Sequence, residues 1–228
     1  MKRFFAAMAG FFLLLGILFL SIDSWCFADA FYKKEYAKLG TAESIGISEE
    51  DLGNATDALL DYLQGKREDL VTYADFESVG EREVFNEKEK LHMVDVRVLY
   101  LNARVLLLGL GGIGLVILVF LFIKNKKKAL IPVLAGYMDA NVILLAFAAA
   151  IGVFVLVDFD TFWTNFHHIF FTNDLWLLDP RTDVLINMVP GQFFFDLVFG
   201  IACSFLAVAL LLYAAAAIAR KRLIRSEG

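Results

Sequence analysis

Four long stretches of the 228-residue chain contain only uncharged, mostly apolar residues. They cover residues 4–22, 105–123, 141–157 and 197–219. Each is close to the roughly 17–25 residues that an α-helix needs to cross the hydrocarbon core of a bilayer. The pattern therefore predicts an all-α membrane protein with four transmembrane helices.

The polar residues between the first two apolar stretches predict a small helical cap. Ser48 is a suitable N-cap for a helix that Gly65 would end, and Asn86 is suitable for a second helix that continues without a breaker into the second span. Strand-like alternation of apolar and polar residues is absent from this segment. The first of these helices would present one apolar face, formed by Leu52, Ala55, Leu59 and Tyr62.

The polar segment that follows the third apolar stretch is rich in aromatic residues. Trp and Tyr gather where a membrane meets water, so this segment is expected to lie in the interface. A helix there would place Trp163, His167 and Asp174 on one face. Pro180 and Pro190 mark turns before the last span.

Ten basic residues that flank the apolar stretches fall on the same predicted side. By the positive-inside rule that side is cytoplasmic, so both termini are expected to be cytoplasmic and residues 23–103 and 158–192 extracellular. The acidic residues, whose excess over the basic ones gives the chain its net charge of −5, lie mostly in the predicted extracellular segments. The basic residues concerned are Lys2, Arg3, Lys124, Lys126, Lys127, Lys128, Arg220, Lys221, Arg222 and Arg225.

These observations together predict the organisation of the whole chain. In order, the expected parts are transmembrane helix one (1–22), an extracellular helical cap leading into helix two (23–103), helix two (104–123), a cytoplasmic loop (124–136), helix three (137–157), an extracellular interfacial segment with a histidine pair (158–192), helix four (193–219) and a cytoplasmic tail (220–228).

The first apolar stretch also resembles a secretory signal peptide, because Lys2 and Arg3 precede it and Ala28-Asp29-Ala30 follows it. It is, however, longer than the about 7–15 residues of a usual signal-peptide core. We therefore expect it to be retained as an anchor.

The glycines from Gly109 to Gly114 have the spacing of a dinucleotide-binding loop. They lie inside an apolar span, with no preceding strand and no suitably placed acidic residue, so that interpretation lacks its structural context. Small residues that allow close helix packing explain them better. No disulfide is expected, because Cys26 lies just outside helix one and Cys203 lies within helix four.

All three histidines of the chain fall on the predicted extracellular side. His92 and Asp95 are three residues apart and share a helical face, so the carboxylate can orient the imidazole or form a plain surface ion pair. His167 and His168 must point in different directions on a helix, so we expect one of them at most in a site. Three histidines and an Asp would also supply enough ligands for zinc, although the usual two-histidine helical motif is missing.

The residues around these histidines resemble a known family. The segments are Glu89–Arg97 (EKLHMVDVR), Phe166–Trp176 (FHHIFFTNDLW) and Leu178–Ile186 (LDPRTDVLI). They are similar to the motifs of the lipoprotein intramolecular transacylases (Lit) of Gram-positive bacteria.

The resemblance implies an acyltransferase that acts on diacylated bacterial lipoproteins at the extracellular leaflet. Such enzymes move the sn-2 acyl chain of a diacylglyceryl-cysteine onto the α-amino group of that cysteine, which gives a lyso-form lipoprotein. The family's two functional histidines map onto His92 and His167, and no role is carried onto His168. An acid–base pair of histidines needs no cofactor and no metal, and the two imidazoles must lie close enough for a substrate carbonyl and amine to fit between them.

Four further residues are expected to support the site. Asp95 would orient His92, Asn173 would donate to the oxyanion, and Trp176 and Asp174 belong to the second motif. Two alternatives remain open, namely a zinc-dependent membrane hydrolase and a non-catalytic membrane partner protein.

Overall fold

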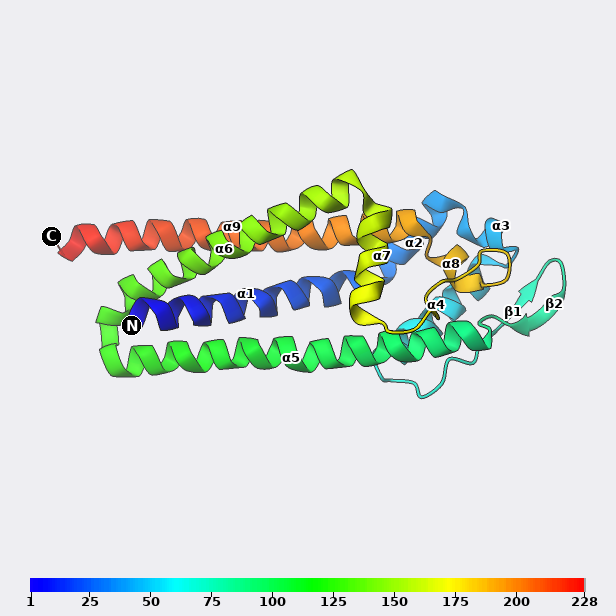
Figure 1. Cartoon of the computed structure of the whole chain (residues 1–228), viewed down its shortest axis with the longest axis horizontal. Coiled ribbons are helices and arrows are strands. Elements are labelled where there is room, and N and C mark those ends of the chain that lie inside the picture. The colour runs from blue at the N-terminus through cyan, green and yellow to red at the C-terminus, as the bar shows by residue number, and fades with distance from the viewer. Residues whose placement is uncertain (228) are drawn as a thin grey trace. The chain divides into compact units, whose positions relative to one another are not determined.

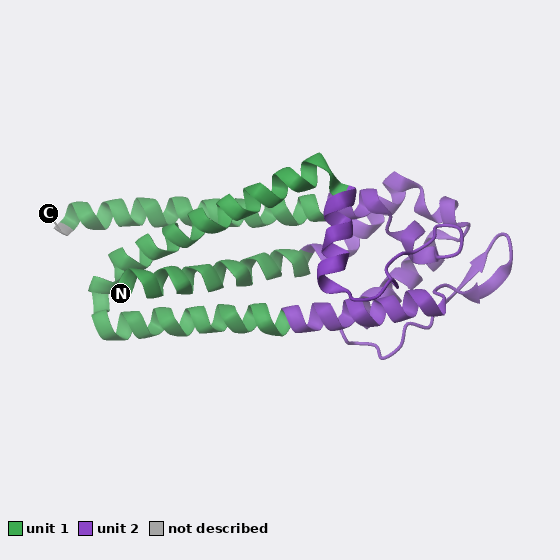
Figure 2. Cartoon of the chain, in the orientation of Figure 1, with its two compact units in different colours: residues 1–24, 104–159, 198–228 green, residues 25–103, 160–197 purple. Residues whose placement is uncertain are grey.

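The computed structural model describes residues 1–227, which fold predominantly into α-helices (Figure 1). The chain forms two compact units, shown in different colours in Figure 2. Unit 1 contains residues 1–24, 104–159 and 198–228, and unit 2 contains residues 25–103 and 160–197. Four helices supply residues to both units: α1 (Lys2–Cys26), α5 (Glu87–Asn125), α9 (Gly191–Glu227) and, by its first residue alone, α7 (Phe159–Phe170).

Within the described residues, three helical stretches are long and apolar enough to cross a membrane: Lys2–Cys26, Glu87–Val157 and Gly191–Ser226. The middle stretch contains two α-helices, α5 and α6 (Leu130–Val157), joined by the short 3-10 helix η1 (Lys126–Ala129). Lys126 adopts a positive φ of 50° at this junction. Helix α6 begins at Leu130, within the expected loop 124–136. Pro132 does not prevent this, because it lies in the first turn, where a missing backbone N–H costs no helical hydrogen bond.

Helices α1, α6 and α9 share a core in unit 1. Its buried members are Leu14, Ala140, Leu144, Phe205 and Ala209. The amide of the fully buried Asn141 donates to the carbonyl of Ala209 at 3.1 Å and so links α6 to α9.

Glycines allow α1 to lie close to its neighbours. A Cβ on Gly136 of α6 would lie 2.5 Å from the backbone nitrogen of Ala7, and one on Gly114 of α5 would lie 2.8 Å from the carbonyl oxygen of Ala9. The expectation that the glycines of residues 109–114 serve helix packing is confirmed for Gly111 and Gly114, whereas Gly109 and Gly112 face open space.

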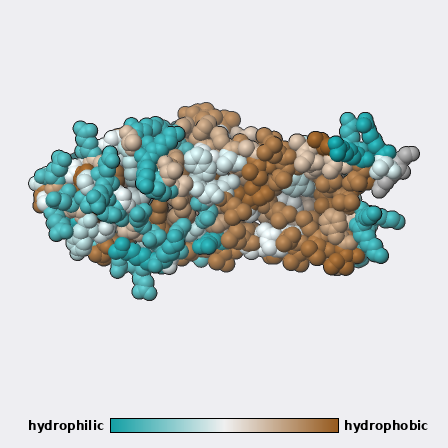
Figure 3. All heavy atoms as spheres, turned by 180° about the vertical axis from the view of Figure 1, so that it is seen from behind, coloured by the Kyte–Doolittle hydropathy of each residue, from teal (hydrophilic) through white to brown (hydrophobic). Residues whose placement is uncertain are grey.

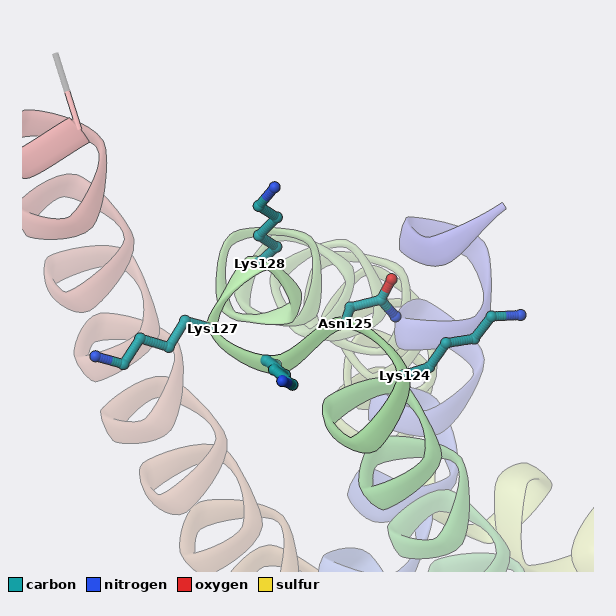
Figure 4. Close-up of a pocket in the computed structure, with 5 residues that line it drawn as sticks. Lys124, Asn125, Lys127 and Lys128 are labelled. Atoms are coloured by element: carbon teal, nitrogen blue, oxygen red, sulfur yellow. The ribbon is translucent and has the colours of Figure 1, made fainter.

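On the face seen in Figure 3, hydrophobic residues cover much of unit 1, and hydrophilic ones gather at the end where α1 begins and α9 ends. The turn from Lys124 to Lys128 belongs to this end. Its labelled lysines extend in different directions, as Figure 4 shows, so they form a solvated basic rim and do not converge on a ligand. Arg3 forms a two-point ion pair with Asp139 at 2.6 and 2.7 Å.

Unit 2 is built from short helices around the first part of α5. Besides the portions of α1, α5 and α9, it contains α2 (Asp29–Leu39), α3 (Thr41–Ile45), α4 (Glu49–Leu63), α7 (Phe159–Phe170, of which Asp160–Phe170 lie in this unit) and α8 (Val184–Met188). Ser48 accepts a hydrogen bond from the backbone of Asp51 and caps α4 as predicted. Gly65, with a φ of 77°, follows the end of that helix.

The expectation that this segment contains no strand is wrong. Strands β1 (Tyr73–Phe76) and β2 (Gly80–Glu83) form an antiparallel hairpin in which Tyr73 pairs with Glu83 and Phe76 with Gly80. Each strand has only four residues, too few for alternation to stand out in the sequence. The guanidinium of Arg82 lies 4.0 Å from the centre of the Phe76 ring and adds a cross-strand contact.

Two reciprocal hydrogen bonds between Asn86 and Glu89 cap the start of α5. The side-chain oxygen of Asn86 accepts from the backbone of Glu89 at 3.1 Å, and the Glu89 carboxylate accepts from the backbone of Asn86 at 2.7 Å. This reciprocal arrangement explains why the helix begins at Glu87, as predicted. The helix then continues without interruption to Asn125.

Candidate active site

Two histidines that are far apart in the sequence meet within unit 2. The ring centres of His92, on α5, and His167, on α7, are 6.2 Å apart, and the rings are inclined by 33°. Both side chains are buried, with exposed fractions of 6% and 7%. The expectation that the two imidazoles lie close together is therefore confirmed.

Aromatic rings enclose the histidine pair. Phe171 contacts both imidazoles, with ring centres 5.4 Å from His92 and 5.6 Å from His167. Trp176 stacks on His167 at 4.7 Å with an angle of 26°, and Trp163 meets the same imidazole edge-on at 5.0 Å. The two imidazoles thus lie within a cluster of aromatic rings.

His167 has a defined tautomer. Its Nδ1 lies 2.7 Å from the backbone carbonyl oxygen of Trp163, one helical turn earlier. A carbonyl oxygen only accepts hydrogen bonds, so Nδ1 must carry the proton. Because burial lowers the pKa of His167, against the opposing effect of this hydrogen bond, the imidazole is neutral near neutral pH and its Nε2 has a free lone pair.

His92 is also held in its neutral form. Burial, followed by the neighbouring His167, lowers its pKa to about 4, although Asp95 opposes the shift. Its Nδ1 is buried and has no hydrogen-bond partner among the described residues. A buried polar atom left unpaired in a site is costly, and such atoms often mark a functional position.

Asp95 and Asn173 bind each other, which differs from the roles expected for them. The Asn173 amide donates to the Asp95 carboxylate at 2.8 Å. The carboxylate therefore holds Asn173, and one of the two N–H groups of the Asn173 amide is engaged. Helical spacing alone predicted that Asp95 and His92 share a face, but it could not reveal a partner 78 residues away.

The other expected residues lie in different surroundings. His168 is exposed and meets Trp176 edge-on at 5.1 Å, so only one member of the histidine pair faces His92, as predicted. Asp174 is exposed. The prediction that it shares a helical face with His167 is wrong, because α7 ends at Phe170.

Two residues of the site were not predicted from the sequence. Phe171 follows His167 by four residues and packs against both histidines, so the density of aromatic residues in this segment was the available clue. Glu89 is completely buried and accepts a hydrogen bond at 2.5 Å from the backbone of Leu185, which attaches the start of α5 to α8. Burial raises the pKa of Glu89, and its backbone hydrogen bonds oppose that rise.

Metal ligands do not gather in this site. Among residues 1–227, no group of three or more His, Cys, Asp or Glu side chains is placed to hold a metal ion. His168, the third histidine considered for zinc, lies on the surface.

Long apolar helices and a buried histidine pair define the protein as a helical membrane protein with a candidate acid–base site. Residues 7–194 match the family model described as lipoprotein intramolecular transacylase Lit. This match covers most of the chain, which therefore belongs to the Lit family of transacylases.

Solved structures show the same fold. The membrane-integral lipoprotein intramolecular transacylase Lit from Bacillus cereus is similar over 98% of this chain and 98% of that chain, with a TM-score of 0.75 and 20% identity. Two variants of that protein, with a histidine replaced by arginine or by alanine, give TM-scores of 0.74 and 0.73 at 18% and 19% identity. They cover 99% and 98% of this chain and 95% and 96% of their own. Among curated proteins, no sequence matches significantly.

Proposed function

We propose that this protein transfers the sn-2 acyl chain of a diacylglyceryl-cysteine lipoprotein to the α-amino group of that cysteine. The observation that carries the proposal is the pair of buried, neutral imidazoles 6.2 Å apart in a member of the Lit family. The product is a lyso-form lipoprotein with an N-acyl chain and a free sn-2 hydroxyl group.

The reaction requires little from the protein beyond placement and proton transfer. The substrate amine attacks the ester carbonyl and forms a C–N bond, after which the C–O bond to the glyceryl group breaks. One proton moves from the amine nitrogen to the departing glyceryl oxygen, so the overall reaction is balanced without water or a cofactor. Because both groups belong to one molecule, holding them together supplies a large gain in effective concentration.

His167 is the base in this proposal. Its Nδ1–H is engaged by the Trp163 carbonyl, which leaves Nε2 to take the proton from the attacking amine and to return it to the glyceryl oxygen. The same carbonyl would stabilise the transient imidazolium. A lowered pKa keeps Nε2 available at neutral pH.

His92 is the donor to the oxyanion. A neutral imidazole carries one N–H, and a proton on Nε2 leaves the buried, unpartnered Nδ1 as an acceptor. The Nε2–H would then stabilise negative charge on the carbonyl oxygen of the tetrahedral intermediate. A pKa of about 4 suits a hydrogen-bond donor that stays neutral throughout the reaction.

The distribution of basic residues supports a placement in the membrane. We propose four transmembrane helices, comprising α1, the later parts of α5 and α9, and α6, with both termini and the Lys124–Lys128 turn in the cytoplasm. Unit 2 would then be the extracellular cap, and the histidines would face the outer leaflet, where a lipoprotein's cysteine lies.

Mass spectrometry of the N-terminal peptide of a reporter lipoprotein tests the function. Expression of the protein should convert the diacylglyceryl form into the lyso form, and His92→Ala and His167→Ala should each abolish conversion. The losses should be strongly non-additive, because the two residues act as one unit. His168→Ala is the matched control and should remain active.

Unchanged lipoprotein in cells that express the wild-type protein would refute the proposal and favour a non-catalytic partner. Loss of activity on washing with a chelator, restored by stoichiometric zinc, would favour the metal-dependent alternative.

A further inference from the structure

The segment that carries Trp176 is attached to α5 near Asp95. The Asn173 amide nitrogen donates to the Asp95 carboxylate at 2.8 Å, and the Asn173 oxygen accepts from the backbone of Leu175 at 3.1 Å. Both ends of the Asn173 side chain are therefore engaged. The first bond joins the segment to α5, and the second stiffens the turn directly before Trp176.

A second attachment follows Trp176. The ammonium of Lys88 donates to the carbonyl of Leu177, and the buried Glu89 accepts from the backbone of Leu185. His92 lies between Lys88 and Asp95 along α5, just as Trp176 lies between Asn173 and Leu177 along its own segment. The two attachments thus bracket the histidine site on both chain segments.

Trp176, which lies between the two attachments, is the residue that stacks on His167, the proposed base. The Trp176 ring lies on His167 at 4.7 Å and 26°. Loss of either attachment would let Trp176 move, and the His167 imidazole would lose the ring that stacks on its face. Displacements on the order of 1 Å in such a site can cost about a hundredfold in rate.

We propose that Asp95 and Asn173 are a positioning pair, which acts by holding Trp176 against His167. This role rests on the proposed transacylase function. It differs from the roles that sequence reasoning assigned to the two residues, because it requires only a hydrogen bond between positions 95 and 173. Neither a carboxylate at 95 nor an amide at 173 is needed for its own sake.

Exchanging the two side chains tests this distinction. Asn173→Asp alone places two carboxylates against each other and should lower kcat by roughly a hundredfold. The double variant Asp95→Asn, Asn173→Asp forms the same hydrogen bond in the opposite direction, and the carboxylate now at position 173 still accepts from the backbone of Leu175. The kcat of the double variant should recover to within about threefold of the wild-type value, since the hydrogen bond is remade.

The assay uses the full-length protein in lipid bilayers with a synthetic diacylglyceryl-cysteine lipopeptide, and it follows formation of the lyso product by mass spectrometry. Asn173→Ala breaks the bond without repulsion and should lose roughly tenfold in rate, the smaller end of the loss expected when a hydrogen bond to a charged group is removed. Thermal unfolding should change little in the single variants, because the pair is partly exposed.

Three results would overturn the inference. Full activity in Asn173→Asp would show that the pair has no positioning role. A double variant as inactive as the single one would mean that the amide serves the oxyanion or that the Asp95 charge serves His92. A wild-type protein without conversion would overturn the proposed function itself, and the role of the pair with it.

Discussion

The buried imidazole of His92 should make the stability of the protein depend on pH in a way that can be calculated. Its pKa is about 4 in the folded protein against 6.5 for an ordinary histidine. The folded state therefore binds the proton less readily than the unfolded state. The contribution of neutral His92 to the free energy of unfolding is fully present above pH 6.5 and is lost as the pH falls toward 4.

The size of the effect follows from the two pKa values. At pH 5 the unfolded state gains about 2 kcal/mol relative to the folded state from this residue alone, and well below pH 4 the full difference is about 3 kcal/mol. For a chain of this length, 2 kcal/mol corresponds to a shift in Tm of roughly 4–8 °C.

The assay is thermal unfolding in detergent at pH 7.5, 6.0 and 5.0, followed by tryptophan fluorescence. Between pH 7.5 and 5.0 the Tm of the wild type should fall by roughly 4–8 °C more than that of His92→Gln, which cannot titrate. His168→Gln is the matched control and should keep the wild-type dependence, because His168 is exposed. An equal fall in Tm for the wild type and His92→Gln would refute the reasoning.

Four further results are expected. Gly136→Ala should destabilise the protein by roughly 1–3 kcal/mol because its Cβ would meet the α1 backbone, whereas Gly152→Ala, which faces open space, should be nearly neutral; equal thermal shifts would contradict this. Glu89→Ala should cost roughly 2–4 kcal/mol, since it leaves two backbone N–H groups without their acceptor; chemical unfolding with no change in midpoint would argue against it. Trp176→Phe should retain most transacylase activity and Trp176→Ala little, because stacking on His167 is the contact that matters; the reverse order in the lyso-product assay would be inconsistent with this. A cysteine at position 75, in a chain with both native cysteines replaced by serine, should be labelled from outside the cell; labelling from the cytoplasm alone would sink the proposed topology.

Properties set by neighbouring residues were predictable from the sequence. The helical state of the apolar stretches, the cap at Ser48 and the start of α5 at Glu87 depend on the composition of a few turns of chain, and the structure has them as expected. The same is true of the divergence of His167 and His168, which follows from the geometry of any α-helix. The family resemblance rests on contiguous motifs and is equally local.

Contacts between distant segments were decided only by the tertiary structure. Nothing in the spacing of Asp95 indicates that it binds Asn173 instead of His92, because the alternative partner lies 78 residues away and is brought near by folding. The hairpin at residues 73–83 escaped prediction because its strands are short and are stabilised by cross-strand pairing. The low pKa of His92 likewise arises from burial beside His167, a free-energy cost that exists only once α5 and α7 have come together.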